Sequence, residues 1–167
     1  MESVVRAPCR IDLAGGTLDL WPLYLYHGGL ELVHMAIDIR ASAQLKGKKA
    51  PLKKGFSLVV RSDDLGTQTR YRSLEELEAS LEKSTSENPL RWVNRVAHAK
   101  FREAGIGGDW TLRTWSETPP GSGLGGSSVL GVALAKALDR GLLGKKSWTS
   151  SELWKMQTFV RDLEAVE

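Results

Sequence analysis

The sequence predicts an α+β fold with a mixed sheet and helices packed on one face. Segments rich in β-branched, aromatic and alternating apolar residues occupy most of residues 4–71. Helical periodicity and capping signals follow over 73–105, one further strand is expected at 109–115, and two helices come after it. Because most strands precede the helices, a single helical layer on one sheet face is expected. The 167 residues fit one domain that is long enough to bury a core.

The strands are expected mainly in the N-terminal part of the chain. The segments with strand composition are 4–7 and 9–14 on either side of Pro8, 30–36, 37–45, 56–61 and 67–71. The last two should form a hairpin around the turn at 63–66. The apolar aromatic run at 21–26 is expected to pack beneath the loop that begins at Gly15.

Four helices are expected from their start and stop signals. Capping-box pairs, a proline at a first turn and terminal glycines are the signals used here. The first helix should start at the capping box of Ser73 and Glu76, and the second should run from Asn88-Pro89 to Gly105. The third, buried helix should end at Gly141 and Gly144, and the fourth should start at the capping box of Thr149 and Glu152.

A glycine-rich stretch joins the strand at 109–115 to the buried helix. Glycines at alternate positions allow tight turns and bring backbone N–H groups close to a ligand. The first turn of the following helix offers unpaired N–H groups and the positive end of its dipole, so an anion is favoured there. A flexible loop with a serine cap fits the same pattern. The candidate phosphate-binding residues are Pro120, Gly121, Ser122, Gly123, Leu124, Gly125, Gly126, Ser127 and Ser128.

Residues 119–128, Pro-Pro-Gly-Ser-Gly-Leu-Gly-Gly-Ser-Ser, resemble the nucleotide-phosphate loop of the GHMP kinases. The family form is Pro-x-x-x-Gly-Leu-Gly-Ser-Ser, and Gly126 replaces its first serine. The resemblance implies ATP and Mg²⁺ as cofactors, with Ser127 near the metal and the phosphates. It also implies that Glu164 is the metal-binding glutamate, although a solvated helix carboxylate is the alternative reading of the residue itself.

Residues 7–20 are similar to the N-terminal substrate motif of sugar kinases in that family, in the form found in heptose-phosphate kinases and fucokinase-type kinases. The resemblance implies a sugar or sugar-phosphate substrate bound by Gly15, Gly16 and Asp19, with Arg10 as a catalytic residue near the transferred phosphoryl group. It also implies a fold like that of ribosomal protein S5 domain 2. From the residues alone, Arg10 could instead form a surface ion pair with Asp12, and Asp19 could simply form a turn.

Composition and charge lead us to expect a cytoplasmic globular protein. The net charge of +3 is too small to indicate nucleic-acid binding, and no apolar run of membrane length is present. Cys9 is the single cysteine, which suits a reducing compartment. The three histidines lack metal-ligand spacing, so structural roles are expected for them. A non-catalytic nucleotide- or sugar-binding regulatory module is the alternative function.

The resemblance also implies that this chain is the N-terminal substrate- and ATP-phosphate-binding domain of a larger kinase. In the family, a catalytic aspartate and a third glycine-rich motif follow at positions beyond Glu167. We therefore expect a missing C-terminal kinase domain, whose docking surface would be apolar and prone to self-association.

We predict that purified residues 1–167 show little or no kinase activity, because the family's catalytic aspartate is not among them. A coupled assay for ADP release with a panel of sugars measures this. Sugar-dependent ATP consumption by the isolated chain would contradict the prediction.

Overall fold

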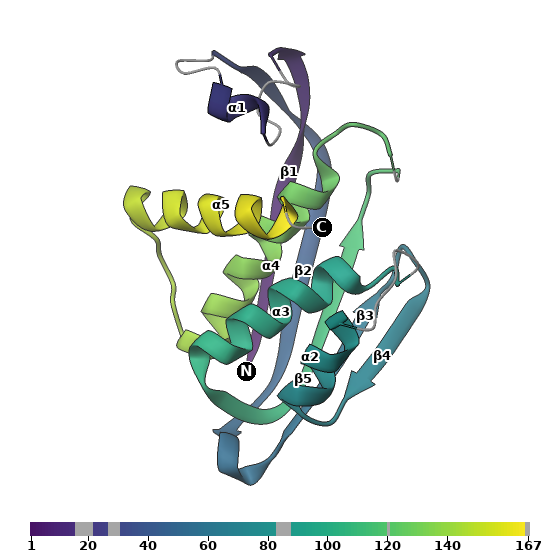
Figure 1. Ribbon diagram of the computed structural model, residues 1–167, viewed down its shortest axis with the longest axis vertical. Coiled ribbons are helices and arrows are strands. Elements are labelled where there is room, and N and C mark those ends of the chain that lie inside the picture. Colours follow the sequence, from purple (N-terminus) through teal and green to yellow (C-terminus); the bar gives the residue numbers. More distant parts are fainter. Residues whose placement is uncertain (16–21, 27–30, 83–87, 120, 166–167) are drawn as a thin grey trace.

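In the described part of the chain, five strands form one mixed sheet in the order β1-β2-β5-β3-β4 (Figure 1). The computed structural model describes residues 1–15, 22–26, 31–82, 88–119 and 121–165. Strands β3 and β5 are parallel, whereas the other neighbouring strands are antiparallel. The strand bounds are β1 Glu2–Ala14, β2 Val33–Pro51, β3 Phe56–Ser62, β4 Thr67–Tyr71 and β5 Ile106–Ser116.

The first two strands are longer than the sequence pattern indicates. The predicted segments on either side of Pro8 are one 13-residue strand, and those at 30–36 and 37–45 lie largely in one 19-residue strand. Proline is tolerated in β1 because this strand is at the edge of the sheet, where a missing N–H leaves a ladder bond unmade on one side only. The pairing register with β2 shifts between Pro8 and Arg10.

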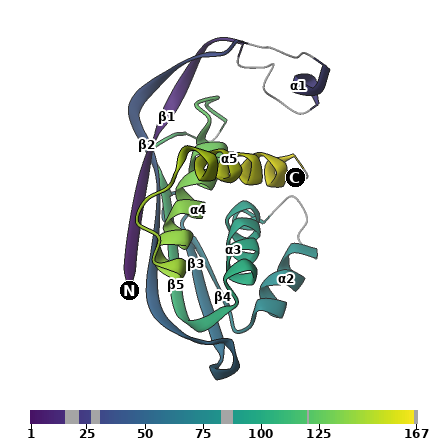
Figure 2. The same cartoon turned by 90° about the vertical axis from the view of Figure 1, so that its left-hand side faces the viewer.

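The four longer helices lie on one side of the sheet, as predicted (Figure 2). Thr149 and Glu152 form the predicted capping box, and Gly105 is the left-handed C-cap at φ +60°. None of the helices in the described residues has the length and apolar composition needed to cross a bilayer. The helical bounds are α1 Leu23–Tyr26, a 3₁₀ turn at Leu52–Lys54, α2 Leu74–Glu82, α3 Arg91–Ala104, α4 Gly126–Leu143 and α5 Ser150–Glu164.

Gly141 does not end its helix, contrary to the prediction, and only Gly144 serves as the C-cap of α4, at φ +70°. Gly141 lies inside α4, where the helix passes close to β1 and β2. A Cβ atom at this position would lie 2.6 Å from Leu45 Cδ2 and 3.2 Å from Ser3 Oγ. The glycine is therefore a packing residue that lets the helix approach the sheet.

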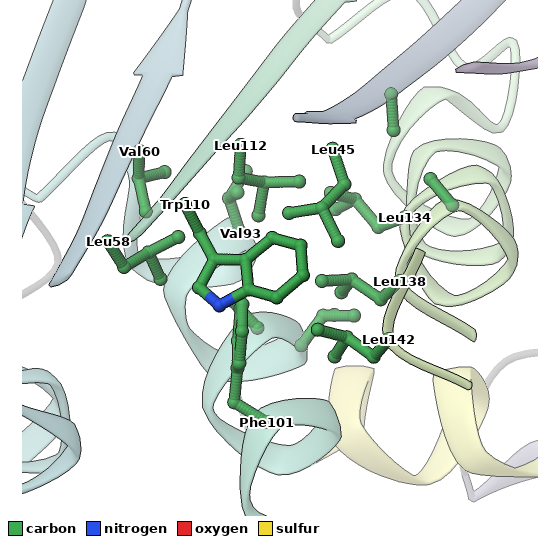
Figure 3. Close-up of a cluster of buried hydrophobic side chains, with 14 of the residues drawn as sticks. Leu45, Leu58, Val60, Val93, Phe101, Trp110, Leu112, Leu134, Leu138 and Leu142 are labelled. Atoms are coloured by element: carbon green, nitrogen blue, oxygen red, sulfur yellow. The ribbon is translucent and has the colours of Figure 1, made fainter. Parts of the chain in front are cut away.

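The core lies between the sheet and the helical layer (Figure 3). Alternate residues of β5 point inward, so Trp110 and Leu112 are buried while Thr111 and Arg113 are exposed. Phe101 of α3 contacts Trp110 edge-on, with ring centroids 5.8 Å apart. Residues of α4 complete this core, namely Leu134, Leu138 and Leu142.

The apolar run near α1 is not packed as predicted. Leu25 and Tyr26 are 63% and 75% exposed. Trp21 lies outside the described residues. Figure 1 shows that α1 lies beside the far end of the β1–β2 ribbon, apart from the other helices.

The capping box of α5 gives a pH-dependent contribution to stability. Hydrogen bonds from Lys145 and from Thr149 lower the pKa of Glu152 from 4.5 to about 2. A lowered carboxyl pKa contributes stability that is present above the unfolded value and lost as pH falls through the folded value. We predict that Glu152→Gln reduces the urea midpoint by a constant amount above pH 4.5, and that the difference from wild type vanishes as pH falls to about 2.

Ser150→Ala at the first residue of α5 is the control, since it removes no titrating group. Its effect on the midpoint should be the same at every pH. A Glu152→Gln effect that did not change between pH 5 and 2 would contradict the role given to this carboxylate.

Candidate functional site

The glycine-rich loop between β5 and α4 has the backbone that an anion site requires. Gly121, Gly123 and Gly125 all have left-handed φ angles, of +73°, +71° and +68°. Gly125 is the N-cap of α4, and no side chain caps the helix there. The first turn of the helix is closed by the bond from Val129 N–H to Gly125 O, at 3.0 Å. The amides of residues 126–128 precede that bond and have no partner within the helix.

Two glycines of the loop leave open space beside the backbone, since a Cβ on Gly121 or Gly123 would meet no atom within 4 Å. Gly126 is different, because a Cβ there would lie 2.8 Å from Thr118 Oγ1. A side chain at position 126 would therefore require Thr118 to move. Pro120, which was also predicted to contact phosphate, lies outside the described residues.

Three of the predicted residues meet at the head of α4. Ser127 Oγ donates to Glu164 Oε1 at 2.5 Å, and Ser128 Oγ donates to Glu164 Oε2 at 2.7 Å. Glu164 is the last residue of α5, which crosses the start of α4 (Figure 1). The carboxylate is therefore close to the positive end of the α4 dipole, where a negative charge is stabilised.

Helix α3 braces this junction through two residues that the sequence did not single out. Trp92 Nε1 donates to Ser127 O at 3.1 Å, and Arg95 Nη1 donates to Leu163 O at 3.1 Å. Both residues are in a helix whose buried apolar face was predicted. An apolar periodicity does not indicate which polar side chains of that helix will hydrogen-bond to another helix.

The oxygen atoms of Ser127, Ser128 and Glu164 fit a Mg²⁺ ion better than a softer metal. Mg²⁺ prefers hard oxygen ligands and uses few protein carboxylates. Among the described residues there is no group of three or more histidine, cysteine, aspartate or glutamate side chains that could hold a metal. Two hydroxyls and one carboxylate are consistent with a cation that takes its other ligands from water and phosphate.

Arg10 of β1 contacts both Asp12 and the glycine-rich loop. Its Nε donates to Asp12 Oδ1 at 3.0 Å, so the ion pair considered from the sequence is present. Its backbone N–H donates to Leu124 O at 3.2 Å. The same side chain lies beside Gly125, with Nε 3.5 Å from the position that a Cβ would take. The arginine therefore places a positive charge next to the head of α4.

Asp12 has a second partner that the sequence did not indicate. His34 Nδ1 lies 2.5 Å from Asp12 Oδ1. Burial raises the pKa of the Asp12 carboxyl, but the hydrogen bond from His34 and the charge of Arg10 together hold it below its usual value. Asp12 consequently stays ionised beside the arginine.

The predicted sugar-binding residues are described only in part. Gly15 follows the end of β1 with φ +80°, and a Cβ there would lie 2.8 Å from Glu31 O. Glycine is therefore required at this close approach of two backbone segments. Gly16 and Asp19 lie outside the described residues.

Residues 91–164 match the family described as GHMP kinases N terminal domain. The chain is 30% identical over 148 residues to an L-fucokinase/L-fucose-1-P guanylyltransferase from Bacteroides fragilis. It is 28% identical over 141 residues to a bifunctional fucokinase/GDP-fucose pyrophosphorylase from Arabidopsis thaliana. Each alignment covers 80% of this chain, but the chain spans only 15% and 12% of these relatives.

A solved structure shows the same fold. The D-glycero-D-manno-heptose 1-phosphate kinase from Bacteroides thetaiotaomicron superposes with a TM-score of 0.71 at 21% identity, covering 98% of this chain and 49% of that one. This likeness confirms the fold class expected from the pattern of strands and helices. The match over residues 91–164 agrees with the family that the two sequence motifs resemble.

We predict that Glu164→Ala lowers the free energy of unfolding by about 1 kcal/mol, because two hydroxyl partners lose a charged acceptor. Urea denaturation measures the change. Asp162→Ala is the matched control on the same helix, since its carboxylate is 60% exposed and pairs with the adjacent Arg161. It should change stability by less than about 0.5 kcal/mol. Equal effects of the two variants would show that Glu164 does not join α5 to α4.

Proposed function

Since residues 91–164 match the GHMP kinases N terminal domain, we propose that the chain holds the nucleotide phosphates and the sugar in an ATP-dependent sugar kinase reaction. The proposed reaction transfers the γ-phosphoryl group of ATP to a hydroxyl of a sugar or sugar phosphate. Two relatives named as fucokinases make L-fucose the first sugar to test.

The observation that carries the proposal is the meeting of Ser127, Ser128 and Glu164 at the uncapped start of α4. The amides of residues 126–128 can donate to phosphate oxygens in the direction of the helix dipole. The Glu164 carboxylate lies at the same place, and two anions at one helix start repel each other. A divalent cation between them removes this conflict, which supports Mg²⁺ as the partner of the glutamate.

Phosphoryl transfer needs charge neutralisation and alignment more than covalent chemistry. Ser127, Ser128 and Glu164 would hold the Mg²⁺ ion, which when bound neutralises charge on the phosphate oxygens. Arg10 adds a fixed planar cation beside Gly125, where it can stabilise negative charge on the transferred group. Gly15, Gly16 and Asp19 are proposed to bind the sugar, since a carboxylate such as Asp19 accepts hydrogen bonds from hydroxyl groups.

We predict that Gly125→Val and Ser127→Ala each weaken binding of ATP in the presence of Mg²⁺ by about tenfold or more. Valine is strained at φ +68° and disturbs the loop amides, whereas alanine removes a metal-facing oxygen. Isothermal titration calorimetry measures both. The Ser127→Ala loss should shrink when Mg²⁺ is omitted, and the Gly125→Val loss should remain.

Gly144→Val is the matched control for strain. Gly144 caps the other end of the same helix at φ +70°, and a Cβ there would meet no atom within 4 Å. It should destabilise the fold to a similar extent without changing ATP affinity. Nucleotide affinity that is equal in wild type and Gly125→Val would refute the phosphate site.

The sugar is identified by assaying the full-length gene product with ATP, Mg²⁺ and a panel containing L-fucose, galactose and a heptose phosphate. Phosphorylation of one of these at a rate well above the others supports the proposed class. Nucleotide binding without turnover of any sugar would favour the non-catalytic regulatory module instead.

A further inference from the structure

We infer that Asp12 and His34 are positioning residues that hold the Arg10 side chain against the phosphate loop at Gly125. This inference rests on the proposed function, because it assigns these two residues a role in the same site. It is carried by hydrogen bonds, strand register and burial in the described residues.

Strand register brings the three side chains together. Asp12 of β1 and His34 of β2 are directly opposite each other in the antiparallel pair. Arg10 precedes Asp12 by two residues, so both side chains are on the same face of the strand. Opposed residues on antiparallel strands are in close contact, and the pairing therefore fixes His34 beside the carboxylate.

One oxygen atom of Asp12 contacts both Arg10 and His34. Asp12 Oδ1 accepts from Arg10 Nε at 3.0 Å and lies 2.5 Å from His34 Nδ1. The carboxylate cannot rotate toward solvent without losing both contacts. Arg10 Nε is one of the three nitrogen atoms of the planar guanidinium, so its bond to Asp12 restrains the orientation of the whole group.

The glycine-rich loop also contacts Arg10. Arg10 N–H donates to Leu124 O at 3.2 Å, and the Arg10 side chain lies within 3.5 Å of the Cβ position of Gly125. The loop and the Asp12–His34 pair thus contact the arginine from two directions. An unrestrained arginine loses side-chain conformational entropy when a ligand orders it. Restraint before binding reduces that loss and therefore favours ligand affinity.

A second arginine–aspartate pair in the chain shows what distinguishes this one. Arg40 Nη2 and Asp38 Oδ1 on β2 are 2.7 Å apart and also two residues apart in sequence. The Asp38 side chain is 87% exposed, whereas those of Asp12 and His34 are 26% and 28% exposed. Asp38→Asn is therefore a matched control for Asp12→Asn.

The first test observes the arginine without any nucleotide. We expect the Arg10 Nε–Hε signal in the NMR spectrum of the wild-type chain to be resolved and slow to exchange with water. Asp12→Asn should abolish this protection, and His34→Gln should reduce it, while Asp38→Asn leaves it unchanged. Protection that persists in both Asp12→Asn and His34→Gln would overturn the inference.

The second test is a double-mutant cycle for binding of ATP with Mg²⁺ by calorimetry. Arg10→Ala should weaken binding by about tenfold, and Asp12→Asn and His34→Gln by roughly two- to fivefold. In the Arg10→Ala background, the Asp12 and His34 variants should have no further effect, since they act through the arginine. Fully additive losses would contradict positioning and indicate a separate structural effect.

Urea midpoints accompany both tests, so that loss of fold is not mistaken for loss of positioning. His34→Gln keeps a side-chain donor and serves if Asp12→Asn fails to fold. If the wild-type chain does not bind ATP with Mg²⁺, the proposed function fails in this chain, while the NMR measurement still decides whether Asp12 and His34 hold Arg10.

Discussion

The close packing of α4 against β1 and β2 is the constraint on which the site depends. Apart from Asp139, the buried residues of α4 are alanine, leucine and glycine, and Gly141 lets the helix come within contact of Leu45 and Ser3. Ser3 Oγ also donates to Ala137 O at 2.7 Å, which ties the buried strand residue to the helix backbone. The buried residues of α4 begin at Gly131, and interiors packed at crystal-like density do not deform gradually. This packing therefore sets the position of the helix, and with it the position of the amides at its start.

Three segments that are distant in sequence meet at that first turn. Arg10 comes from β1, Ser127 and Ser128 come from α4, and Glu164 comes from the end of α5. None of these contacts is local, so each depends on how the layers pack. The bonds from α3 to Ser127 and Leu163 join the same elements from the other side. A change in the core between α3 and α4 should consequently alter the site from a distance.

Local signals in the sequence predict which elements form and where helices are capped. They do not predict the lengths of the strands or the contacts between distant elements. The Thr149–Glu152 capping box and the Gly105 cap lie where they were expected, because a cap is formed by a few neighbouring residues. The length of β2 could not be predicted, since its continuity is decided by pairing with β1 and β5. Glu164 could be placed on a helix, but its approach to Ser127 depends on the direction in which α5 crosses α4. The His34–Asp12 contact likewise follows from strand register, which alternation alone does not specify.

The electrostatics of the site give Arg10 particular weight. Residues 119–128 contain no charged side chain, so the loop can attract an anion only through its amides, its serine hydroxyls and the dipole of α4. That dipole is already shared with the Glu164 carboxylate, which is hydrogen-bonded to the first helical serines. A triphosphate arriving at this place therefore meets one fixed anion. A cation bound by Glu164 and the guanidinium of Arg10 can both offset that charge. Because the second is a flexible side chain on an edge strand, the restraint imposed by Asp12 and His34 decides whether its charge is at the loop or in solvent.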